Sequence, residues 1–150
     1  MPVIEGNTQF IAQSDFKPKI EKCLALLSSK AGTYNGWISS NVVKIRAFSK
    51  SGADVSKSSI DIAKTTFDAS ETWLASVLVH ETQHIRQYKA KKNYYGKEAE
   101  LECNQFQLEV LRLIGAPQSE IAYLLKQDGN HFDLNGDGVY DQKDYDLRTW

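Results

Sequence analysis

A pair of histidines inside a long helical pattern constrains this chain more than any other feature. His80 and His84 lie within the segment from Glu71 to Lys91, whose apolar spacing predicts an amphipathic helix. Residues four apart lie one turn from each other on the same face of a helix, so both imidazoles can reach one metal ion. Neutral imidazole is a good ligand for zinc. Glu81 lies about 100° around the helix from His80, and from there it can take a proton from a metal-bound water. The sequence therefore predicts a zinc site with a general base beside it.

A catalytic zinc ion needs a third protein ligand and one open position. The next predicted helix, residues 97–114, is apolar on most sides and is expected to be buried. It offers three acids as ligands, Glu98, Glu100 and Glu102. Fifteen residues separate His84 from Glu100, which is enough for a turn and an antiparallel return. Asn104 lies one turn beyond Glu100, where it could hydrogen-bond a zinc-bound histidine and fix its orientation.

The order of these motifs resembles that of the gluzincin family of zinc metallopeptidases. Residues 80–84 match H-E-x-x-H, and residues 100–104 match the family pattern E-x-x-A-[DN], except that Cys103 replaces the small alanine. The resemblance covers residues 60–115 and favours Glu100 over the other two acids as the third zinc ligand. It points to short, single-domain members, including regulatory types of phage and stress-response systems.

The resemblance implies zinc-dependent hydrolysis of peptide bonds by an endopeptidase, with Glu81 as the general base that activates a zinc-bound water. Gluzincins bind the substrate peptide as an added strand beside the strand that precedes the active-site helix, which would be Ile60–Phe67 here. They often use a tyrosine or a histidine to stabilise the oxyanion. The candidates for that role are Tyr94, Tyr95 and His131.

The remaining patterns predict one α+β domain, mostly helical, over residues 1–150. Period-two alternation from Trp37 to Phe48 and a short run from Ile60 to Phe67 predict two strands, with a Ser- and Gly-rich loop between them. Besides the two ligand helices, further helices are predicted over residues 16–31 and 119–127. We expect a zincin-like core, in which two ligand-bearing helices lie beside a small antiparallel sheet.

The chain has two cysteines, Cys23 and Cys103, and each falls at an apolar position of a predicted helix. Their separation is unlike the close spacing of paired metal ligands. We expect buried thiols that pack as small hydrophobic groups. A disulfide that joins the two helices is the alternative.

Residues 133–144, near the C-terminus, fit the twelve-residue calcium loop of an EF-hand. The expected ligands are the side chains of Asp133, Asn135, Asp137, Asp141 and Asp144 and the carbonyl of Val139. Aspartate at the last position resembles dockerin loops, although a dockerin has two loops and this chain shows one. We expect a structural calcium ion that pins the tail. A polar turn rich in Asp and Asn, without an ion, is the alternative.

The sequence gives two opposing indications of the localisation. A lone calcium loop of this kind, with a dissociation constant of about 10⁻⁴–10⁻³ M, would bind calcium outside the cell but would be empty in the cytosol. In contrast, no signal peptide is visible at the N-terminus, which favours the cytoplasm or an export route that the sequence does not show.

The composition argues against several classes of function. The net charge is -1, and no apolar run approaches the roughly 18 residues of a membrane span. The basic stretch Arg86–Lys97 is expected to be a solvated face. We therefore expect neither a nucleic-acid nor a membrane partner. The expected partner is a peptide or protein substrate, and the protein is expected to be a monomer.

The sequence is compatible with three functions. The first is a zinc endopeptidase that serves as a toxin, an effector or a regulatory protease. The second is a non-catalytic binding or regulatory module on a zincin scaffold, and the third is a calcium-dependent adhesion or assembly module. The intact Glu81 favours the enzyme, because a scaffold would not need the base.

Overall fold

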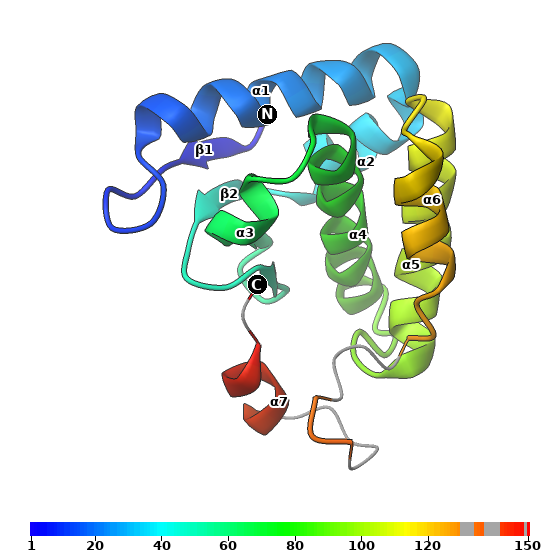
Figure 1. Cartoon of the computed structure of the whole chain (residues 1–150). Coiled ribbons are helices and arrows are strands. Elements are labelled where there is room, and N and C mark those ends of the chain that lie inside the picture. The colour runs from blue at the N-terminus through cyan, green and yellow to red at the C-terminus, as the bar shows by residue number, and fades with distance from the viewer. Residues whose placement is uncertain (130–133, 137–141, 149) are drawn as a thin grey trace.

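The computed structural model describes residues 1–129, 134–136, 142–148 and 150, which form an α+β fold that is mostly helical (Figure 1). This confirms that the fold is α+β and mostly helical. In chain order the elements are β1 (Val3–Glu5), α1 (Gln13–Lys30), α2 (Gly32–Asn41), β2 (Lys44–Ala47), β3 (Gly52–Asp54), β4 (Ser59–Ile62), α3 (Lys64–Phe67), α4 (Glu71–Lys89), α5 (Lys97–Leu113), α6 (Gln118–Leu125) and α7 (Gln142–Leu147). Within the described residues, no helix is long and apolar enough to cross a membrane.

The strands form one mixed sheet in the order β1–β2–β4–β3. β1 pairs with β2 and β2 pairs with β4 in parallel, whereas β3 pairs antiparallel with β4 at the edge. The expectation of an antiparallel sheet is therefore wrong. The reason lies in the connection: α1 and α2 come between β1 and β2, and a helical crossover of this length allows the chain to return in the same direction.

The strands are shorter than the sequence patterns predict. The first part of the predicted strand, residues 37–41, belongs instead to α2, which buries Tyr34 and Ile38 one turn apart on the same face. The strand is therefore limited to Lys44–Ala47. β4 ends at Ile62, and the rest of that predicted strand, residues 64–67, forms the short helix α3. The loop expected between the two strands contains β3.

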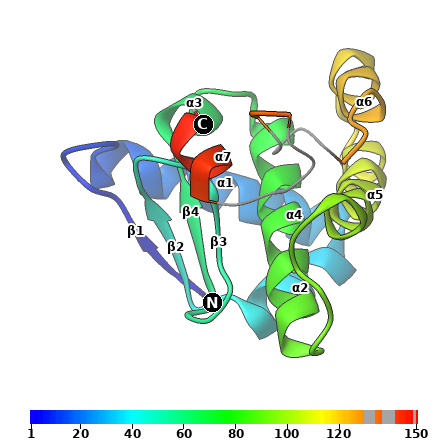
Figure 2. The same cartoon turned by 90° about the horizontal axis from the view of Figure 1, so that it is seen from below.

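The helices follow the predictions more closely. α1 buries its apolar stripe, which consists of Phe16, Ile20, Cys23, Leu24 and Leu27. α4 begins after Ser70, whose Oγ accepts a hydrogen bond from the backbone N–H of Trp73 at 3.1 Å. α4 lies between the sheet and α5 (Figure 2), and most of its residues are buried. Both histidines of the predicted motif are therefore inside the protein.

Candidate metal centre

The turn between α4 and α5 brings the two predicted ligand helices together. α4 ends at Lys89, and α5 begins after Gly96, whose φ of 88° is a left-handed conformation that glycine adopts without strain. α5 then returns alongside α4 (Figure 2). This return places Glu100 opposite the two histidines of α4, as the spacing predicts.

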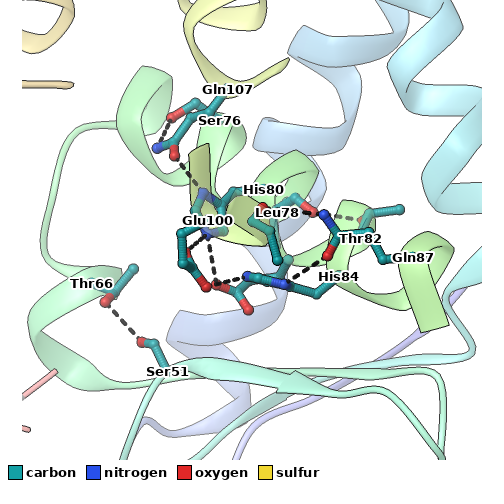
Figure 3. Close-up of polar contacts among 12 residues, drawn as sticks. Ser51, Thr66, Ser76, Leu78, His80, Thr82, His84, Gln87, Glu100 and Gln107 are labelled. Carbon is teal, nitrogen blue, oxygen red and sulfur yellow. Dashed lines mark hydrogen bonds and ion pairs between the residues drawn. The ribbon is translucent and has the colours of Figure 1, made fainter. Parts of the chain in front are cut away.

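One carboxylate bridges the two histidines (Figure 3). Glu100 Oε1 lies 2.8 Å from His84 Nε2, and Glu100 Oε2 lies 3.1 Å from His80 Nε2. All three side chains are buried. Of the rival acids on α5, Glu98 is exposed, and Glu102 accepts hydrogen bonds from two glutamine side chains of α4. Among the three acids, the structure therefore brings Glu100 to the histidine pair.

Gln107 on α5 determines which nitrogen of His80 carries a proton. Ser76 Oγ donates to the Trp73 carbonyl at 2.7 Å, so Ser76 Oγ accepts the hydrogen bond from Gln107 Nε2 at 3.0 Å. The amide of Gln107 thus presents its oxygen to His80, with Oε1 2.9 Å from Nδ1 (Figure 3). Because an amide oxygen can only accept, His80 Nδ1 is protonated, and Nε2 is the nitrogen that faces Glu100.

Gln87 has the same effect on His84. Gln87 Nε2 donates to the Ala99 carbonyl and to Glu102 Oε1, both at 3.1 Å. Its amide oxygen is then turned to His84, with Oε1 3.2 Å from Nδ1. His84 Nδ1 therefore donates, and its Nε2 also faces Glu100.

This arrangement favours a positive charge between the rings and the carboxylate. With Nδ1 protonated, a neutral imidazole points its Nε2 lone pair at an oxygen of Glu100, and two acceptors at hydrogen-bond distance repel each other. A proton on Nε2 or a metal ion removes this repulsion. Two imidazole nitrogens and a carboxylate oxygen are a donor set that zinc takes in proteins, so these residues fit zinc.

Without a metal, protons take the place of that cation. Burial disfavours a charge on His84, but the Glu100 carboxylate and hydrogen bonds with Cys103 and Glu100 raise the His84 pKa well above its usual value. Burial also raises the pKa of Glu100, but His84 and His80 outweigh it and hold the Glu100 pKa far below its usual value. A charged pair, His84 and Glu100, is thus buried in the metal-free protein.

Cys103 brings a sulfur atom to the same site. It is fully buried on α5, and the ligand atoms of His80, His84 and Cys103 all lie within 4.8 Å of one another. Burial raises the pKa of the Cys103 thiol to about 11, although a hydrogen bond with His84 acts in the opposite direction. Cys23 lies elsewhere, with Sγ 3.6 Å from the Glu71 carbonyl oxygen. Both cysteines are free, so the expectation of buried thiols is confirmed and the alternative of a disulfide is wrong.

Glu81 and His80 line a cleft of about 400 Å³. Glu81 Oε1 lies 3.9 Å from His80 Nε2, and the carboxylate makes no hydrogen bond with any residue that the structure describes. Apolar and aromatic side chains also line the cleft, among them Trp73, Val77, Tyr123, Leu124 and Trp150. A carboxylate that is open to a cleft and adjacent to the histidines can take a proton from a water bound there.

Two residues that contact the histidines were missed from the sequence, Gln87 and Gln107. A signal was present, because Gln87 lies three residues after His84 and Gln107 lies seven residues after Glu100, so each shares a helix face with a ligand. The sequence instead suggested that Asn104 orients a histidine. Asn104 lines the cleft, and its Nδ2 has no hydrogen-bond partner among the described residues.

The two tyrosines expected to stabilise an oxyanion lie in the turn between α4 and α5. Tyr94 packs edge-on against Tyr88 and Tyr95, with ring centroids 5.4 and 5.3 Å apart. Neither Tyr94 nor Tyr95 is among the residues that line the cleft. The third candidate, His131, lies outside the described residues.

Two of the expected calcium ligands lie in the part of the chain that the structure describes. Asp144 in α7 is fully buried, and its Oδ1 accepts hydrogen bonds from the backbone N–H groups of Leu134 at 2.9 Å and Asn135 at 3.3 Å. The last position of the predicted loop therefore folds back onto its beginning. The other expected ligands lie outside the described residues, namely Asp133, Asp137, Val139 and Asp141. Calcium binding stays a prediction.

Comparisons of this chain with family models, with curated proteins and with solved structures find no match. The donors, distances and burial of the site therefore carry the functional argument.

The role of Gln107 can be tested by substitution. Gln107→Leu is expected to weaken zinc binding by about 10–100-fold, because the outer hydrogen bond fixes the tautomer and the ring orientation of His80. The affinity can be measured by competition with a coloured chelator. Gln105→Leu is the matched control, since Gln105 is exposed on the same helix. Equal zinc affinity in both variants would show that the bond to Gln107 has no influence on the metal.

Proposed function

We propose that this protein is a zinc-dependent endopeptidase with a zincin-like core, in which His80, His84 and Glu100 hold the metal and Glu81 is the general base. The observation that carries the proposal is the buried carboxylate of Glu100, which bridges two imidazoles whose Nδ1 atoms are both occupied by glutamine oxygens. Three protein ligands leave one position open on a zinc ion. The cleft gives solvent and substrate access to His80 and Glu81.

The residues of the chain then have separate tasks in hydrolysis. When bound, zinc supplies a Lewis acid that lowers the pKa of a coordinated water to about 7 and polarises a carbonyl group. Glu81 accepts the proton of the attacking water and delivers it to the nitrogen of the leaving amine as the peptide bond breaks. Gln87 and Gln107 hold the two imidazoles with Nε2 directed away from the glutamines and toward Glu100.

We further propose that a substrate peptide adds to β3 as an extra strand. The strand expected from the sequence to do this, Ile60–Phe67, corresponds to β4, which is paired with β2 on one side and β3 on the other and so has no free edge. β1 and β3 are the two edge strands, and Figure 2 shows β3 between β4 and α4. Ser51, the residue before β3, lines the cleft that contains Glu81. An extended peptide along this edge would pass the base.

A small peptidase of this kind suits a toxin, an effector or a regulatory protease. The alternative is a non-catalytic binding or regulatory module that keeps the zincin scaffold. The carboxylate of Glu81 beside the cleft favours the enzyme, because a module that only binds metal gains nothing from a buried acid without a hydrogen bond to the described residues.

We also propose that residues 133–144 bind a structural calcium ion. Asp144 already holds the start of the loop, and Arg148 donates to the Ser51 carbonyl, which fastens the tail beside the cleft. An ion bound to the folded loop would stabilise this attachment. Its role would be structural and separate from hydrolysis.

Metal analysis and peptide cleavage test the proposed function together. The purified protein is expected to contain about one zinc ion per chain, in line with a three-ligand catalytic site. Cleavage of a peptide library is expected to stop after dialysis against a chelator and to return when zinc, but not magnesium, is added. Zinc binding without any cleavage would support the non-catalytic module, and the absence of bound zinc would contradict both.

A further inference from the structure

Cys103 adds a fourth donor atom beside the three proposed zinc ligands. Cys103 lies three residues after Glu100, so both side chains emerge from the same face of α5. The thiol is fully buried, and its sulfur lies within 4.8 Å of the ligand atoms of both histidines. In the E-x-x-A-[DN] pattern this position is a small alanine with no donor atom. Here it places a sulfur at the metal site.

Cysteine is a strong ligand for zinc. Thiolate sulfur binds zinc at about 2.3 Å, and a coordinating thiol loses its proton outright. Two imidazoles, one carboxylate and one thiolate fill the four positions of a tetrahedral zinc ion. Closed sites of this kind leave no position for a water molecule.

We propose that Cys103 is the fourth protein ligand of the zinc ion, so that His80, His84, Glu100 and Cys103 form a closed resting site. The inference rests on the proposed zinc site and adds its regulation: hydrolysis requires Cys103 to leave the metal. The thiolate occupies the position that the attacking water needs, and Glu81 has no metal-bound water to deprotonate until the thiolate is displaced. The protein is therefore latent when all four ligands are bound.

Cobalt substitution tests the ligand directly, without any measurement of activity. Co²⁺ bound to the wild-type protein is expected to show a near-ultraviolet charge-transfer band from the thiolate to the metal. Cys103→Ala is expected to lose this band while it still binds one metal ion through the other three ligands. Cys23→Ala is the matched control, because Cys23 is equally buried but lies away from the site, and it is expected to keep the band. Cys103→Ser retains the size of the side chain and replaces Cys103→Ala if the alanine variant fails to fold.

Activity provides a second measurement. Zinc-loaded Cys103→Ala is expected to cleave peptides at least about tenfold faster than the wild type, as follows if the closed form holds nine-tenths or more of the molecules. A wild-type cobalt protein without the charge-transfer band, or a band that persists in Cys103→Ala, would overturn the proposal. The two proposals fail separately. A band without cleavage in any variant keeps Cys103 as a ligand and rejects the peptidase, whereas zinc-dependent cleavage without a band does the reverse.

Discussion

Glu81→Gln is expected to lower kcat/KM for zinc-dependent peptide cleavage by about 10²–10⁴-fold, the range that a positioned general base contributes. Glutamine has nearly the same shape as glutamate but cannot accept the proton of the attacking water. Glu81 lies beside His80 without a place in the expected ligand set, so the bound zinc is expected to stay at the wild-type level. Cleavage of a fluorogenic peptide from the library and metal analysis of the same sample measure both quantities.

The control for this variant is Glu98→Gln. Glu98 is an exposed acid on α5, so the same chemical change there is expected to leave both cleavage and zinc content unaltered. The comparison can be repeated in the Cys103→Ala background, where the site has its open position. Undiminished cleavage by Glu81→Gln in both backgrounds would remove Glu81 from the mechanism.

The part of the site that could be predicted from the sequence is the part that helix geometry determines. Residues four apart on one helix must share a face, so His80 and His84 meet whatever the rest of the fold does. The return of Glu100 depended on the length of the turn between α4 and α5, and that length was sufficient. The sulfur of Cys103 was also accessible to this reasoning, since it lies one turn from Glu100. Its apolar position in the helical pattern suggested a thiol that only packs in the core.

The part that could not be predicted depends on contacts between distant segments. β1 and β3 have three residues each, which is too short for a period-two pattern. The parallel pairing of β2 with β4, and with it the loss of a free edge on β4, follows from the placement of β3 outside β4. Gln87 shares a face of α4 with His84, so this partner could have been inferred from helix geometry. The contact between His80 and Gln107 could not, because it forms only after α5 has packed against α4.

Glu100→Ala is expected to destabilise the metal-free protein by about 3–5 kcal/mol, the cost of removing one partner from a buried ion pair. The loss of this carboxylate leaves the two imidazoles buried without their common acceptor, since both Nε2 atoms face Glu100. Urea denaturation in the presence of a chelator measures the free energy of unfolding. Glu98→Ala is the control, and its exposed position predicts a change below about 1 kcal/mol. If the two variants were equally stable, and zinc bound to both with wild-type affinity, Glu100 would be neither the acceptor of the histidines nor the third ligand.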